Sequence, residues 1–217
     1  MLQTVVVPPQ FEPIFAEAEA RVSAFFAQME RDPARGTIKI AGERYILMRG
    51  ESLFTSLREN MAEQFGADIT ESFLYDLAKT VGRSDAQRFA EKLDLKDPIH
   101  KLSAGPVHFS HSGWALVDIL PESVPSPDIN YFLVYNHPNT FESEISLRRQ
   151  EKSSKPVCVF SAGYSAGWCS YSFDLDLDAR EIMCLARGDS HCRFVMAPQD
   201  QLDKRIAGYL LGLRDKP

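Results

Sequence analysis

Residues 181–192 read Glu181-Ile182-Met183-Cys184-Leu185-Ala186-Arg187-Gly188-Asp189-Ser190-His191-Cys192. Gly188 and Asp189 lie near the middle of this stretch, and both residue types suit a tight turn. We therefore predict a β-hairpin with strands at about residues 180–185 and 192–196. If the strands pair symmetrically about Gly188, Cys184 and Cys192 lie opposite each other with Cβ atoms about 4.5–5.5 Å apart. That separation would let them share one metal ion.

Two more residues could complete a metal site. Cys158 begins a segment with helical spacing, residues 158–173, and Glu181 stands three residues before Cys184. Three thiolates and one carboxylate make a four-ligand set that favours zinc, because soft sulfur ligands select this ion. In a regular strand, positions three apart face opposite ways. Glu181 and Cys184 can therefore share an ion only if the strand bends or bulges between them.

Other interpretations of the cysteines stay open at this point. Buried cysteines are often small apolar core residues, and a redox-active pair is conceivable although the spacing is not Cys-x-x-Cys. A hairpin pair is only half a site, and spacing alone does not single out Glu181. Cys169 lies three helical turns from Cys158, about 16 Å at 1.5 Å per residue, which is too far to bind the same ion.

The rest of the sequence predicts an α+β domain, with an antiparallel sheet packed against several helices and a zinc-stabilised C-terminal hairpin. Apolar periodicity predicts a helix at residues 11–31 and three helical segments between residues 53 and 93. Two of these segments carry apolar stripes, formed by Leu53, Leu57, Met61 and Phe65 and by Ile69, Phe73, Leu77 and Val81.

Further elements are expected on both sides of these helices. We predict a hairpin at residues 37–47, strands at 107–120 and 130–135, and a helix at 140–149 capped by Thr140 or Asn139. We divide the single domain into an N-terminal part of about residues 11–104, a ligand- and zinc-binding part of about 105–200, and a C-terminal helix at 198–217.

Composition excludes several protein classes. The net charge of −6 disfavours direct nucleic-acid binding, because phosphate neutralisation needs a basic surface. The N-terminus lacks the pattern of a secretory signal, and no stretch reaches the roughly 18 apolar residues of a membrane span. We therefore expect a cytoplasmic protein that contacts neither membrane nor nucleic acid. In a reducing compartment the four cysteines are expected as metal ligands or thiols rather than as disulfides.

Four segments resemble the vinyl-4-reductase-type (hydrocarbon-binding) domain: Pro156-Val157-Cys158, Gly163-Tyr164-Ser165-Ala166-Gly167, Glu181-Ile182-Met183-Cys184 and Gly188-Asp189-Ser190-His191-Cys192. Upstream, residues 36–47 and 104–106 resemble the N-terminal sensory module of XylR/DmpR-type activators, which respond to phenol and xylene. The resemblance extends from about residue 15 to residue 200. It implies a structural zinc site at Cys158, Glu181, Cys184 and Cys192, a homodimer, and a buried aromatic-ligand pocket beside the metal.

Aromatic side chains and a few polar groups typically line such a pocket. The expected ligand-binding residues are His108, Phe109, Trp114, Phe132, His137, Tyr164 and Trp168, with Tyr135 and Tyr171 as further candidates. Each aromatic taken alone could equally belong to the core. Phenol sensors of this family hold the ligand hydroxyl with a histidine and a tryptophan. The matching positions here are Phe109 and His137, so the resemblance implies a more apolar ligand, or one held by His137.

Three functions are compatible with these observations. The first is a non-catalytic sensor, a zinc-containing homodimer that binds a small aromatic or other hydrophobic molecule and regulates a partner or transcription. The alternative is an enzyme or accessory factor acting on a hydrophobic substrate such as a tetrapyrrole pigment precursor, but we find no nucleotide-binding glycine loop and no acid/base pair. A scaffold or trafficking adaptor is the third. The related activators continue into ATPase and DNA-binding domains, and this chain has no Walker motif.

Overall fold

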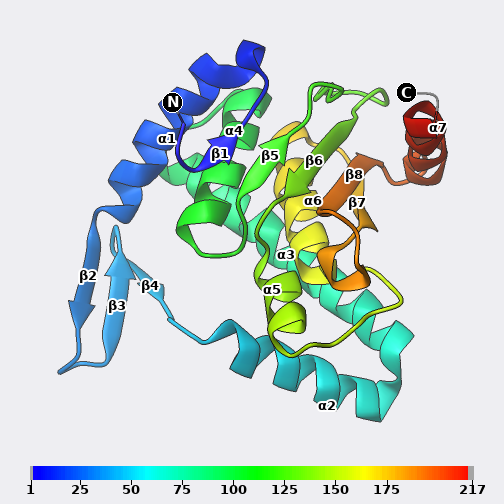
Figure 1. The fold of residues 1–217 in the computed structure, drawn as a ribbon. Coiled ribbons are helices and arrows are strands. Elements are labelled where there is room, and N and C mark those ends of the chain that lie inside the picture. The colour runs from blue at the N-terminus through cyan, green and yellow to red at the C-terminus, as the bar shows by residue number, and fades with distance from the viewer. Residues whose placement is uncertain (1, 215–217) are drawn as a thin grey trace.

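The computed structural model describes residues 2–214, and its main body is built on a five-stranded sheet (Figure 1). The strand order is β1-β5-β6-β8-β7, and every neighbouring pair is antiparallel except β1 with β5. The strands are β1 (Val5–Val6), β5 (Val117–Ile119), β6 (Leu133–His137), β7 (Leu177–Met183) and β8 (Cys192–Pro198). The predicted α+β class with an antiparallel sheet is confirmed.

Helices cover both faces of this sheet. They are α1 (Glu12–Phe26), α2 (Ser56–Phe65), α3 (Ala67–Lys92), α4 (Pro98–His111), α5 (Phe141–Arg148), α6 (Val159–Phe173) and α7 (Leu202–Arg214). The large core, which includes residues of α1, α3, α4 and α6, lies on one face of the sheet. On the other face, Leu202 and Ile206 of α7 pack on Val134, Val195 and Ala197. Of the predicted helix at 198–217, residues 215–217 lie outside the described part.

The predicted hairpin at residues 37–47 is confirmed by β3 (Thr37–Ile40) and β4 (Glu43–Tyr45), which pair antiparallel. Ala41 and Gly42 connect them with φ of 49° and 82°, the backbone that a two-residue hairpin turn requires. A third strand, β2 (Met29–Asp32), pairs with β3 and was not predicted. The helix expected to reach residue 31 therefore ends at Phe26.

Two other expectations were wrong. The second and third helical segments form one 26-residue helix, α3, instead of two. Residues 107–111, expected in a strand, belong to α4, and the strand is only Val117–Ile119. Asp97 caps α4 by accepting hydrogen bonds from the N–H groups of Ile99 and His100, and the helix continues through Pro106. The expected boundary at residues 104/105 thus falls inside a helix.

The apolar stripes of α2 and α3 do not form the core of this chain. Phe65, Ile69 and Phe73 are 54%, 63% and 50% exposed. The buried face of α3 is instead made of smaller residues and one leucine at helical spacing: Thr70, Leu74, Ala78, Gly82 and Ala86. This face packs against α6, which runs beside α3 in Figure 1.

Glycines bring the two backbones together. A Cβ atom on Gly82 would lie 2.2 Å from the carbonyl oxygen of Tyr164, and one on Gly163 would lie 2.2 Å from that of Tyr75. Only glycine fits at such distances. The close contact fixes the position of α6. This helix contributes both to the cysteine cluster and to the cavity described below.

In the part of the chain that the structure describes, no helix is both long enough and apolar enough to cross a membrane.

Candidate metal centre and aromatic cavity

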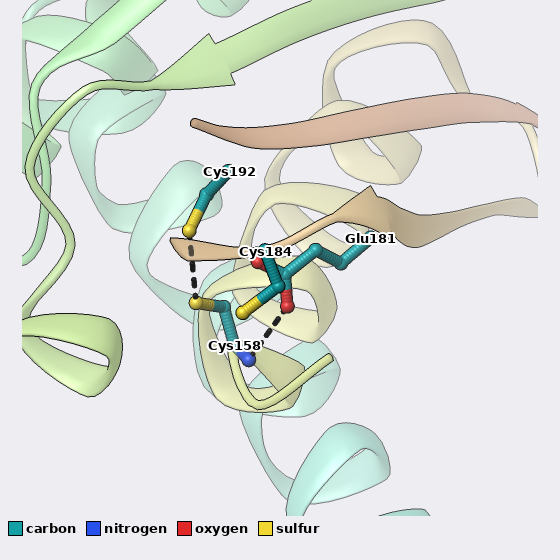
Figure 2. Close-up of side chains that lie close together, drawn as sticks. All are labelled: Cys158, Glu181, Cys184 and Cys192. Atoms are coloured by element: carbon teal, nitrogen blue, oxygen red, sulfur yellow. Dashed lines mark hydrogen bonds between the residues drawn. The ribbon is translucent and has the colours of Figure 1, made fainter. Parts of the chain in front are cut away.

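Four side chains from three elements converge at the start of α6 (Figure 2). One donor atom each of Cys158, Glu181, Cys184 and Cys192 lies within 4.8 Å of all the others, and all four residues are buried. The Cys158 and Cys192 sulfurs are 3.7 Å apart, close to the roughly 3.8 Å that two zinc–sulfur bonds of about 2.3 Å span at a tetrahedral angle. A disulfide would need about 2.05 Å, and all four cysteines, each in the described part, are free.

The hairpin brings its ligands to one side through a β-bulge. Glu181 pairs with Phe194 and Met183 with Arg193, so the register shifts between the two pairs. The extra residue reverses the alternation, which is the condition that the sequence set for Glu181 and Cys184 to share an ion. Gly188, at φ 98°, and the Asp189 carboxylate, which accepts from the Cys184 N–H at 2.7 Å, shape the turn.

The ionisation of this cluster favours a cation. Burial raises the pKa of Glu181 to about 8 and also raises that of Cys158, whereas thiol hydrogen bonds from Cys158 and Cys192 lower the pKa of Cys184 to about 2. The Cys184 thiolate is thus stabilised by hydrogen bonds from the neighbouring thiols, which keep their protons. A bound divalent ion would replace those protons and let all four groups ionise.

Glu181 also has an oxygen available for a metal. Its Oε2 accepts from the Cys158 N–H at 2.8 Å, and its Oε1 is buried without a hydrogen-bond partner among residues 2–214. The donor set therefore fits a structural zinc ion with four protein ligands. Such an ion would tie the β7–β8 hairpin to α6.

Glu142 supports the same helix start and was missed in the sequence. Its two carboxylate oxygens accept from the N–H groups of Phe160 and Ser161 at 3.0 and 2.9 Å, and burial raises its pKa to about 7. The carboxylate comes from the first turn of α5. In the sequence it is indistinguishable from an ordinary acidic residue at the start of its own helix, so no pattern could have revealed its role.

A cavity of about 40 Å³ lies between α4, α6 and the sheet, beyond the metal cluster along α6. Apolar atoms make up most of its wall. The lining residues are Leu102, Gly105, Pro106, Phe109, Val117, Ile119, Leu133, Tyr135, Tyr164, Ser165, Trp168, Cys169 and Met196. The sequence had suggested neither Ser165, Cys169 nor Met196. Ser165 lies three residues before Trp168 and Cys169 lies four after Ser165, so helical spacing along α6 would have found both.

Six of the seven expected ligand-binding residues gather around this cavity. Phe109, Tyr164 and Trp168 line it. His108 stacks on Trp168 at 5.3 Å between ring centroids, and Trp114 packs on Tyr164 at 4.8 Å. His137 packs between Phe109, Tyr135 and Phe194.

Phe132 is the exception, because it lies on the other face of the sheet, against Tyr209 of α7. Side chains alternate along a strand, and Leu133 and Tyr135 point to the cavity. The alternation rule places Phe132 on the opposite face.

Both histidines beside the cavity are neutral at pH 7, since burial lowers the pKa of His108 and of His137 to about 3. His108 Nδ1 lies 3.2 Å from the Tyr164 hydroxyl, which donates to Asp85 at 2.7 Å. The two histidines therefore present neutral ring surface to the neighbouring aromatic side chains, and no positive charge.

Two family models match consecutive parts of the chain. The model described as an activator of aromatic catabolism matches residues 25–122, and that of the vinyl-4-reductase domain matches residues 138–198. The chain is therefore similar to these two modules in consecutive parts, and the resemblance seen in the sequence is confirmed.

Individual proteins agree with this assignment. The phenol regulator MopR of Acinetobacter guillouiae is 27% identical over 168 residues, covering 77% of this chain and 30% of MopR, so the chain spans less than a third of that relative. Among solved structures, the phenol-responsive sensory domain of the transcription activator PoxR, with phenol, matches with a TM-score of 0.73. That match has 19% sequence identity and covers 94% of this chain and 98% of the other.

Proposed function

We propose that this chain is a non-catalytic sensory domain that binds a small aromatic molecule and regulates transcription or a partner protein. The aromatic cavity carries the proposal, since it lies between the two modules' helices and the sheet, in a fold shared with the PoxR sensory domain. The names of MopR and PoxR, both phenol-responsive regulators, support the same ligand class. The residues proposed to contact the ligand are Phe109, Tyr164 and Trp168, with His108, Trp114 and His137 behind them.

Zinc is the second part of the proposal, bound by Cys158, Glu181, Cys184 and Cys192. The ion would hold the start of α6, and α6 also supplies Tyr164, Ser165 and Trp168 to the cavity wall. The metal would thus be structural and would stiffen one side of the ligand site. Four free cysteines without a disulfide among the described residues suit a reducing compartment, which supports a cytoplasmic location.

Ligand binding should require an expansion of the cavity. A cavity that accommodates benzene measures about 150 Å³, well above the 40 Å³ present here. The side chains of α4 and α6 would therefore shift when a ring enters. That coupling between occupancy and helix position is what a sensor needs.

Phenol at about 100 times its dissociation constant is expected to raise the melting temperature by about 8 °C, because binding to the folded state alone adds about 2.7 kcal/mol. The chain has only two tryptophans, Trp114 and Trp168, and both pack at the cavity. Their fluorescence should change in the same titration. Phe132→Ala serves as the control and should keep the response. A panel of phenols, benzenes and toluenes that neither shifts the melting temperature nor changes the fluorescence would refute ligand binding.

We further propose a homodimer formed through the exposed apolar stripes of α2 and α3. Contiguous apolar surface of this kind marks interaction sites. The exposed apolar residues of the two helices are Phe65, Ile69, Phe73 and Leu77, and the segment before α2 adds Ile46, Leu47, Met48 and Leu53.

Phe73→Glu is expected to convert the dimer to a monomer in light scattering coupled to size exclusion, because a buried unpaired carboxylate would oppose association. Phe73 is half exposed in the single chain, so the fold should survive. Ile129→Glu, at a similarly exposed site away from α2 and α3, is the matched control and should stay dimeric. A monomeric wild-type protein would contradict the proposed assembly.

A further inference from the structure

Tyr135 carries the one hydroxyl on the cavity wall that is fully buried and lacks a hydrogen-bond partner among residues 2–214. Its side chain comes from β6 and is 1% exposed. Ser165 lies close enough to influence Tyr135, yet no hydrogen bond of ordinary geometry joins them. A buried hydroxyl without a partner is costly and rare in folded proteins.

Two other polar groups on the cavity wall already have hydrogen-bond partners. The Tyr164 hydroxyl donates to Asp85, and the Trp168 indole N–H donates to the Lys101 carbonyl at 2.9 Å. The Tyr131 hydroxyl, buried in the same core, lies 3.7 Å from the Met196 sulfur. Among the wall residues of the described chain, only Tyr135 has a hydroxyl that is fully buried and lacks a hydrogen-bond partner.

His137 is the other candidate, since both of its ring nitrogens are buried and lack partners among residues 2–214. Its ring, however, packs against Phe109, Tyr135 and Phe194 and is not part of the cavity wall. A molecule in this cavity would therefore contact Tyr135 and not His137.

We propose that Tyr135 is the polar anchor of the ligand site, so that the cognate ligand is a single aromatic ring bearing one hydroxyl or carbonyl group. This inference rests on the proposed function. A tyrosine hydroxyl both donates and accepts, and the ligand's polar group supplies the partner that the protein itself does not. The remaining wall is apolar except for Ser165 and Cys169 beside this point, so a second polar group elsewhere on the ring would lose its hydration without compensation.

The test compares phenol with toluene, which has nearly the same shape and no hydroxyl, by calorimetric titration of wild-type protein and of Tyr135→Phe. The wild-type protein should prefer phenol, and Tyr135→Phe should reduce the phenol-to-toluene affinity ratio about tenfold, with toluene affinity unchanged. Tyr131→Phe is the matched control, because this tyrosine is equally buried and does not line the cavity. It should keep the wild-type ratio.

A stability measurement separates anchoring from a structural role. Without ligand, Tyr135→Phe should melt at or above the wild-type temperature, since it removes a hydroxyl that has no partner. A lower melting temperature together with an unchanged affinity ratio would overturn the proposal. Binding of neither compound to the wild-type protein would instead overturn the proposed function, whereas equal loss of phenol and toluene affinity in Tyr135→Phe would refute the anchor alone.

Discussion

Cys192→Ser is expected to abolish stoichiometric zinc binding and to leave the domain largely unfolded. The Cys192 sulfur is fully buried and lies 3.7 Å from that of Cys158, so serine would remove one of three thiolates with no substitute nearby. Structural zinc contributes about 10–16 kcal/mol in small zinc domains, which matches or exceeds the roughly 5–15 kcal/mol that usually stabilises a whole domain. Even a partial loss should therefore remove most of the folded population.

The measurement is zinc per chain by mass spectrometry, together with thermal unfolding followed by circular dichroism. Cys169→Ala is the control, since Cys169 is also a buried free cysteine but lies outside the ligand set. It should keep one zinc ion per chain and a cooperative transition. Well-folded, reduced wild-type protein without stoichiometric metal would show that the four residues are only a polar cluster.

Only the hairpin half of the candidate metal site was predictable from local sequence, and the complete ligand set came from the family resemblance. The turn around Gly188 brings Cys184, directly after β7, close to Cys192 at the start of β8, and Cys158 directly precedes a helix that helical spacing could identify. The β-bulge beside Glu181 was not predictable from the pattern, although it was the stated condition for the site. Glu142 could not have been found, since it acts on the end of a different helix.

Apolar periodicity failed where the molecule buries small residues instead of large ones. The stripe of Ile69 and Phe73 predicted the core-facing side of a helix, yet those residues are exposed and Ala78 and Gly82 face the core. A hydrophobic stripe predicts that one face of a helix is covered. It does not show whether the covering surface belongs to the same chain or to another one. Gly163 and Gly167, together with Gly82, set the distance between α3 and α6.

The close approach of the α3 and α6 backbones predicts a second large loss of stability. Gly167→Ala is expected to destabilise the domain by at least about 3 kcal/mol, at the upper end for overpacking in a core, and to lower the melting temperature by about 10 °C. A Cβ atom at Gly167 would lie 1.9 Å from the Lys79 carbonyl oxygen and 2.9 Å from the Arg83 nitrogen. Both are backbone atoms of α3, so no side-chain rotation relieves the clash and the helices must separate.

Gly208→Ala provides the matched control for urea unfolding of both variants. Gly208 lies within α7, and a Cβ atom there would meet nothing within 4 Å. Alanine should therefore stabilise that helix by about 0.5–1 kcal/mol through its higher helix propensity. Since α6 carries Cys158 at its start and Trp168 on the cavity wall, Gly167→Ala should also weaken zinc and phenol binding together. Wild-type stability of Gly167→Ala would mean that α3 and α6 are not in backbone contact, and the link between metal, cavity and the exposed face of α3 would be lost.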